Sequence, residues 1–151
     1  MGFWKFQDRL TLWLLSWGMA SIASGLMLGR SEDDFRRGIG EQFVGWGVIN
    51  AVIAVLGQRG SLKKRRLPDA NEVESLSRER NKLKRLLWIN TGLDVVYMAG
   101  GWRAVQTRGQ MDERWRGRGW GIIFQGGFLF FFDLINAVLL SRIELTRDGQ
   151  E

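Results

Sequence analysis

The chain has 151 residues, enough for one folded domain, and it contains neither cysteine nor histidine. These absences exclude thiol nucleophiles, histidine bases, and the metal or haem sites that depend on either residue. Lysine and arginine exceed the acidic residues by 22 to 16, while eight tryptophans and nine phenylalanines argue against a disordered chain.

Four apolar segments of about 20 residues follow one another, separated by charged stretches. They cover residues 10–29, 38–57, 86–106 and 119–141. A helix of this length crosses about 30 Å of hydrocarbon, because each residue adds about 1.5 Å. A soluble bundle is the alternative, but its helices would need a polar face that these segments lack. The sequence therefore predicts an all-α, four-helix membrane bundle that forms a single domain over residues 1–151.

The aromatic stretch at residues 3–6, Phe-Trp-Lys-Phe, precedes the first apolar segment. Aromatic side chains gather at membrane–water interfaces. We therefore expect this stretch to lie at the lipid headgroups as a short anchor, with a frayed tail as the alternative.

Basic residues are unevenly divided between the two sides of the predicted bundle. Fourteen lysines and arginines fall on the side of the termini, Arg147 among them, and eight fall on the other side. The positive-inside rule then places both termini and the long middle connection in the cytoplasm, with the protein in the inner membrane. A basic patch suited to anionic lipid headgroups follows the second segment, and fixing the topology is its other role. This patch consists of Lys63, Lys64, Arg65 and Arg66.

A helix is predicted to lead from the cytoplasm into the third segment. Asp69 and Glu72 have the spacing of a capping box, just after Pro68. Nothing interrupts the pattern from there to Gln106, so residues 69–85 are expected to form a cytoplasmic helical extension. Its apolar side chains could pack on a continuation of the second segment or on a partner protein, or the helix is simply solvated. The seam that they form contains Val73, Leu76, Leu83 and Leu87.

Weak internal similarity indicates a repeat of two helical hairpins. Aligning Gln42 with Gln125 matches glycine and isoleucine residues of the second and fourth segments, and aligning Gly18 with Gly92 relates the first to the third. Both hairpins would begin in the cytoplasm, so the repeat is parallel, and two hairpins make a four-helix bundle. Chance similarity of glycine-rich apolar runs is the alternative.

Polar side chains are predicted at membrane depth in every segment. Asp94 and Asp133 each lie eight residues from the cytoplasmic end of their segments, which is about 12 Å at about 1.5 Å per residue. The expected layer comprises Ser16, Asn50, Asn90, Asp94, Tyr97, Gln125, Asp133 and Asn136. Helical spacing favours inward positions, where amides hydrogen-bond between helices. Near the opposite interface, Glu41 and Arg103 are candidates for an ion pair, or each extends to water.

Three roles remain open for this layer. It could fix the packing of the helices through hydrogen bonds. Two carboxylates at equal depth could instead share a proton, or hold a cation together with amide oxygens. The layer could also contact a bound lipid, quinone or pigment. No cofactor, metal site or set of catalytic residues is predicted.

An arginine-rich stretch at residues 114–118, Arg-Trp-Arg-Gly-Arg, interleaves an aromatic residue with basic ones. Such patterns bind single-stranded nucleic acid. Because the predicted topology places this stretch on the outer side of the membrane, contact with the membrane interface is favoured and no nucleic acid is expected.

The second half of the chain resembles an uncharacterised bacterial family of four-span membrane proteins. The resemblance is carried by Asn90-Thr91-Gly92-Leu93-Asp94-Val95-Val96-Tyr97 and by Gln125-Gly126-Gly127-Phe128-Leu129 with Asp133. It implies a fold but no activity. It also implies a histidine in relatives at the position of Asn136, so a titratable or metal-binding group would be missing here.

Small size, glycine-lined segments and the lack of a catalytic residue set favour a non-catalytic membrane protein. We expect a small accessory or scaffold subunit of a larger membrane assembly, or a homo-oligomer, in a bilayer with anionic headgroups. The alternatives are a proton or cation pathway that uses Asp94 and Asp133, and a protein that binds a lipid, quinone or pigment.

Overall fold

The computed structural model describes residues 2–143 and residue 145. Its four long helices are α1 (Phe3–Gly29), α2 (Asp34–Arg65), α3 (Val73–Gln106) and α4 (Glu113–Ser141). A short 3₁₀ helix, η1 (Arg108–Gln110), lies between α3 and α4. No strand occurs in the described residues. The prediction of an all-α bundle of four helices is confirmed.

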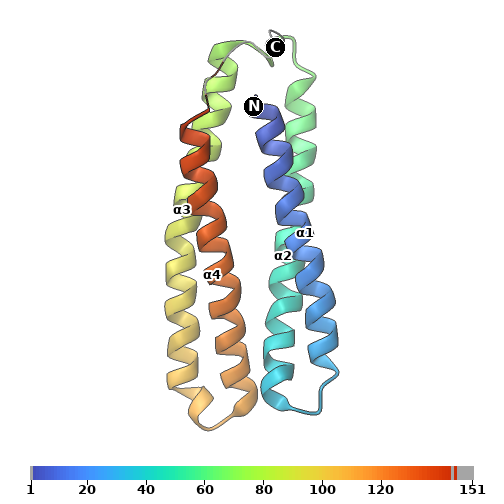
Figure 1. Cartoon of the computed structure of the whole chain (residues 1–151), viewed down its shortest axis with the longest axis vertical. Helices are drawn as coiled ribbons and strands as arrows, with labels where there is room; N and C mark the ends of the chain where they lie inside the picture. Colours follow the sequence, from blue (N-terminus) through green and yellow to red (C-terminus); the bar gives the residue numbers. More distant parts are fainter. Residues whose placement is uncertain (1, 144, 146–151) are drawn as a thin grey trace.

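The four helices form two hairpins that stand side by side (Figure 1). Helix α1 packs along α2, α3 packs along α4, and the hairpins meet through α2 and α4. The start of α1, the α2–α3 connection and the end of α4 lie together at what we call the head end. The α1–α2 and α3–α4 connections lie at the opposite end, the hairpin end. The predicted arrangement of two hairpins is therefore present.

Two helix boundaries near the head end differ from the prediction. Helix α2 continues to Arg65, eight residues beyond the end of its apolar segment, because its polar continuation packs against α1 and α3. Helix α3 begins at Val73 and not at Asp69. The Glu72 N–H donates to the backbone carbonyl of Asp69 at 3.0 Å, and this turn replaces the expected capping box. The Asp69 carboxylate instead accepts a hydrogen bond from the Ser75 hydroxyl at 2.9 Å.

Glycine pairs bring the two helices of each hairpin into backbone contact. In the first hairpin, a Cβ atom on Gly18 would lie 2.8 Å from the carbonyl oxygen of Gly47, and one on Gly25 would lie 2.7 Å from that of Gly40. In the second hairpin, a Cβ on Gly101 would lie 2.7 Å from the carbonyl oxygen of Gly119. Only glycine permits such close approach, so these positions fix where the helices cross.

The glycine contacts also define the register of the internal repeat. Gly47 faces the backbone of residues 18 and 22, and Gly126 faces that of residues 94 and 98. Gly40 likewise faces residues 25 and 29, and Gly119 faces residues 101 and 105. Helix α1 thus corresponds to α3, and α2 to α4, as predicted. The predicted alignments were wrong in register, because Gly18 corresponds to Asp94 and not to Gly92.

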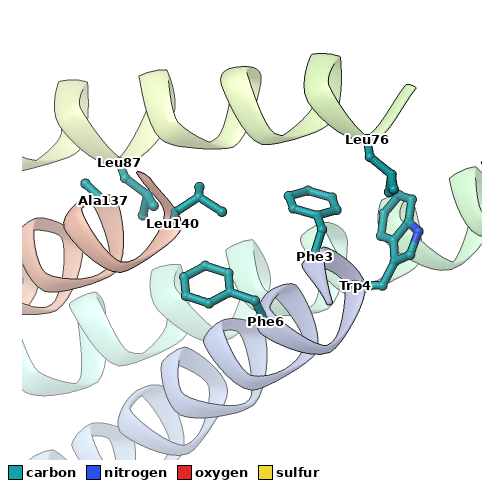
Figure 2. Packing of buried hydrophobic residues seen from close by; sticks show 7 residues of the cluster. All are labelled: Phe3, Trp4, Phe6, Leu76, Leu87, Ala137 and Leu140. Atoms are coloured by element: carbon teal, nitrogen blue, oxygen red, sulfur yellow. The ribbon is translucent and has the colours of Figure 1, made fainter. Parts of the chain in front are cut away.

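An apolar cluster closes the head end (Figure 2). Its buried members are Phe3, Trp4, Phe6, Leu76, Leu87, Ala137 and Leu140. The aromatic residues at the start of α1 point toward α3 and α4, so the expectation of a headgroup anchor at residues 3–6 is wrong. In the predicted α3 seam, Leu76 and Leu87 are buried and Leu83 is partly buried, whereas Val73 is exposed. The extension of α3 is therefore packed against the rest of the chain.

Three of the described helices, α1, α2 and α4, are long and apolar enough to cross a membrane. Helix α3 has the length but not the hydropathy, because its segment includes Asn90, Asp94 and Arg103. Asp94 and Asn90 add little polarity to the outer surface of α3, because Asp94 is buried and Asn90 is partly buried. The outward face of α3 carries exposed apolar side chains, including Trp88, Val96 and Trp102.

Candidate functional site

The most buried polar side chain in the described bundle is Gln125 of α4, which has no exposed surface. Its amide oxygen accepts a hydrogen bond from the Trp17 indole N–H at 3.0 Å, and its amide nitrogen donates to the Ser21 hydroxyl at 3.1 Å. The Trp17 ring also stacks on Phe128, with ring centroids 3.6 Å apart. This Gln125 network links α1 to α4 across the two hairpins.

A second polar group lies about 12 Å closer to the head end, because Asp133 follows Gln125 by eight residues in α4. Asp94 and Asp133 are both buried. Asn90 and Asp94 of α3 both lie near the Asp133 carboxyl. Both aspartates therefore lie inside the bundle, and their joint action stays a prediction. We call Asn50, Asn90, Asp94 and Asp133 the carboxylate group.

Two atoms of the carboxylate group have no hydrogen-bond partner in the described residues. They are Oδ2 of Asp94 and Nδ2 of Asn50, and each side chain is 3 % exposed. Trp46 of α2 and Tyr97 of α3 are in contact, with ring centroids 5.0 Å apart. Asn50 lies one turn from Trp46 toward the head end, and Asp94 lies one turn from Tyr97 in the same direction. The unpaired donor and acceptor therefore share one level of the bundle.

Other members of the predicted polar layer lie elsewhere. Ser16 is exposed, and the inward serine of α1 is Ser21, which the sequence analysis missed. Tyr97 is 39 % exposed and contributes its ring to the contact with Trp46. Asn136 donates to the backbone carbonyl of Phe132 in its own helix at 2.7 Å. The predicted single layer is therefore two separate groups.

The inward face of α1 is marked by its glycines. Gly18 and Gly25 are seven residues apart, as are Gly40 and Gly47 on the opposing helix. Ser21 lies between the first two on the same face, whereas Ser16 does not. This glycine spacing is the sequence signal that could have identified Ser21.

The predicted ion pair between Glu41 and Arg103 does not form. Arg103 is exposed on α3, while the Glu41 carboxylate accepts hydrogen bonds from Arg114 and from Arg118, whose Nε lies 2.7 Å away. The reason is the packing of the hairpins, since α2 lies against α4 and not against α3 at this end. Arg118 also lies over the Trp115 ring. The arginine-rich stretch at residues 114–118 is thus partly engaged within the chain.

The predicted headgroup patch at residues 63–66 is divided by the fold. Lys63 and Arg66 are exposed. Arg65 turns inward, where it donates to both carboxylate oxygens of Asp8, at 2.9 and 2.6 Å, and to the Trp4 backbone carbonyl at 3.0 Å. Because Arg65 joins α2 to the start of α1, it is a structural residue and not part of a lipid-facing patch.

Lys64, the remaining member of that patch, forms an ion pair with Glu79 of α3. Lys82 is the second partner of this carboxylate, at 3.2 Å. Partial burial would raise the pKa of Glu79, but the hydrogen bonds from Lys64 and Lys82 outweigh it and hold this pKa below its ordinary value. The ion pair joins the polar ends of α2 and α3 outside the apolar segments.

The carboxylate group offers oxygen and amide ligands but no larger set of ionisable residues. Among the described residues, no cluster of three or more aspartate, glutamate, histidine or cysteine side chains could hold a metal ion. Two buried carboxyls with neighbouring amides can exchange a proton or hold one small cation. They can equally serve helix packing, although the unpaired atoms show that the hydrogen bonds among the described residues are incomplete.

Comparison with known protein families gives a match over residues 13–134, which include the Gln125 network and the carboxylate group. The chain belongs to the DUF6992 family. DUF6992 is a family of unknown function, so the expectation of an uncharacterised family is confirmed. The match ends before Asn136, so the position at which a histidine was expected in relatives lies outside it. Comparisons with curated proteins and with solved structures give no match.

Proposed function

We propose that this DUF6992 protein is a non-catalytic scaffold subunit that spans a membrane four times. The observation that supports this proposal is the contrast between closely packed helix backbones inside the bundle and apolar side chains on its outer surface. Glycine pairs join the helix backbones inside, while large apolar side chains remain exposed along all four helices. Exposed apolar side chains in such numbers are covered by lipid or by another protein.

Helix α3 is the fourth span in this proposal, although its overall hydropathy is lower. Its side chains Leu86, Ile89, Leu93 and Val96 are exposed, and Asp94 is turned inward. A helix with this distribution is suited to lipid on one side and to α4 on the other. Crossing four times returns the chain to its starting side, and the positive-inside rule supports placing both ends on the cytoplasmic side of a bacterial inner membrane.

Single introduced cysteines test the topology directly, because the natural chain contains none. Asn71 precedes α3 at the head end, and Met111, which is 90 % exposed, follows α3 at the hairpin end. We expect Met111→Cys to react with a membrane-impermeant maleimide in intact cells. Asn71→Cys should react only after permeabilisation. Labelling of both cysteines under the same condition would mean that α3 does not cross.

Native mass after gentle detergent extraction tests the scaffold role. We expect the protein to migrate in an assembly well above the 17.3 kDa of one chain with its detergent. The assembly should contain other membrane proteins or further copies of the chain. The proposal would be contradicted if the protein were a monomer in every mild detergent and if cross-linking also gave no larger species.

A proton or cation pathway is the second candidate, and the unpaired atoms of Asp94 and Asn50 favour it. In liposomes, the wild-type protein should carry a proton or sodium current that the double variant Asp94→Asn, Asp133→Asn abolishes. Glu32→Gln is the matched control, because Glu32 is exposed in the α1–α2 connection. Equal flux in the wild type and in empty liposomes would eliminate this candidate.

A further inference from the structure

An open recess of about 410 Å³ lies on the outward face of α3, toward the head end. Helix α3 packs mainly against α4, so much of its surface faces away from the bundle (Figure 1). The residues that line the recess are spaced three and four apart, which places them on one face of the helix. They are Asn81, Lys84, Arg85, Trp88 and Ile89. The α3 recess therefore combines two cations with an amide, an indole ring and an aliphatic side chain.

The two cations of the α3 recess are available to a ligand. In the part of the chain that the structure describes, the side chains of Lys84 and Arg85 form no hydrogen bond and no ion pair. Helix α3 has no acidic residue between Glu79 and Asp94. The Glu79 carboxylate is already engaged by two other lysines, and Asp94 is buried in the bundle. Charge complementarity therefore favours an anion from outside the described chain.

The α3 recess lies where the outward face of this helix changes from polar to apolar. Lys84 and Arg85 directly precede the apolar segment at residues 86–106. Trp88 and Ile89 follow them on the same face, and each is nearly half exposed. Tryptophan is enriched at the level of the lipid headgroups in membrane proteins. An anion bound here would therefore have apolar surface next to it on one side and water on the other.

Other exposed cations at the head end lie farther from the apolar surface. Lys63 and Arg66 of α2 are six and nine residues beyond the second apolar segment, which is about 9 and about 14 Å at about 1.5 Å per residue. Charges act on one another over about 8 Å at physiological ionic strength. These two residues therefore attract a headgroup only weakly, although they carry the same charge as the pair on α3.

We propose that the α3 recess binds the headgroup of one anionic phospholipid, with Lys84 and Arg85 at its phosphate. A guanidinium can donate two parallel hydrogen bonds to a phosphate, and an ammonium adds a compact positive charge. The amide of Asn81 and the indole of Trp88 supply further N–H donors. The acyl chains then lie along the apolar continuation of α3.

This proposal rests on the membrane location proposed above, and it adds a defined lipid site that neither the scaffold nor the ion-pathway candidate requires. The cysteine-labelling experiment tests the location without reference to any lipid. If the labelling shows that α3 crosses and the lipid experiment fails, only the headgroup site is wrong.

The experiment is a titration of phosphatidylglycerol, and separately of phosphatidylcholine, into the detergent-solubilised protein, followed by native mass spectrometry. The test variant is the double substitution Lys84→Gln, Arg85→Gln. The matched control is Lys63→Gln, Arg66→Gln, which removes the same charge from the same end of the molecule. Thermal unfolding checks that both variants are folded.

We expect the Kd for phosphatidylglycerol to rise about thirtyfold in the test variant, because each charge near an anionic group contributes about fivefold. In the control, screening should limit the rise to about threefold. The weaker binding of phosphatidylcholine should be the same in all three proteins. Equal rises in the two variants would overturn the proposal, since the lipid would then respond to net charge alone.

Inorganic phosphate distinguishes a lipid from a soluble anion. At a concentration equal to that of the lipid, it should leave phosphatidylglycerol bound to the wild type, because the acyl chains add contacts with the apolar surface of α3. Displacement of the lipid by phosphate under this condition would also overturn the proposal, because the recess would then be a site for a free anion.

Discussion

Gly38 of α2 and Gly117 of α4 face each other's helix in reciprocal contacts. A Cβ atom on Gly38 would overlap the backbone carbonyl of Arg114, and one on Gly117 would overlap that of Phe35. Phe35 precedes Gly38 by three residues, and Arg114 precedes Gly117 by the same number. The two contacts are therefore related by an approximate two-fold axis between α2 and α4.

Replacing either of these glycines should separate the hairpins. In Gly38→Ala or Gly117→Ala, the added methyl group meets rigid backbone, so the helices must move apart. We expect the free energy of unfolding in detergent to fall by about 1–3 kcal/mol. Gly45→Ala, which meets open space, should be neutral or stabilising by up to about 1 kcal/mol. Equal effects at all three positions would contradict the contact assigned here.

The two serines of α1 provide a test of helix orientation. Ser21→Ala removes the partner of the Gln125 amide, which then remains buried without that hydrogen bond. We expect a loss of about 1 kcal/mol in the free energy of unfolding, the usual size for a hydrogen bond between membrane helices. Ser16→Ala should have no measurable effect, because Ser16 is exposed. The opposite order of effects would mean that α1 is rotated about its axis.

The hairpin end offers a test of which helices are neighbours. Arg118→Gln weakens the ion pair with Glu41 and should lower the thermal midpoint slightly, since partly exposed ion pairs contribute less than about 1 kcal/mol. Arg103→Gln should not change it. A double-mutant cycle with Glu41→Gln should give coupling energy to Arg118 but none to Arg103. A coupling energy between Glu41 and Arg103 would instead support the Glu41–Arg103 ion pair that the sequence predicts.

Acid should weaken the packing of α2 on α3 at the head end. The folded-state pKa of Glu79 is below its unfolded-state value, so its ion pairs stabilise the fold above that unfolded value, about 4.3 for glutamate. This stabilisation is lost as the pH falls through the folded-state pKa. We expect Glu79→Gln to lower the thermal midpoint at pH 7 and the difference from wild type to shrink below about pH 4. A difference that stays constant with pH would contradict this role of Glu79.

Much of the fold could be predicted because apolar segments of membrane length are a strong signal. The ends of α2 and α3 were harder to predict, since their polar continuations are stabilised by partners from other helices, such as Asp8 for Arg65. The inward turn of the aromatic residues at the start of α1 likewise depends on Leu76, which lies about 70 residues away in the chain.

The polar core shows the same division between local and long-range information. Asp94, Asp133 and Gln125 were identified because each interrupts an apolar run. Ser16 was misplaced because an error of a few residues in the assumed inward face rotates every side chain of a helix. The partner of Glu41 could not be found by spacing alone, since it depends on which hairpin faces which.

The approximate two-fold axis has a consequence for how such a protein can arise. Each hairpin carries one half of a self-complementary backbone surface, so a gene that encodes a single hairpin could yield the same bundle as a homodimer. Fusion of two such genes would free each half to diverge. Asp94, which stands where the first hairpin has Gly18, is a residue that a symmetric ancestor would have carried either twice or not at all.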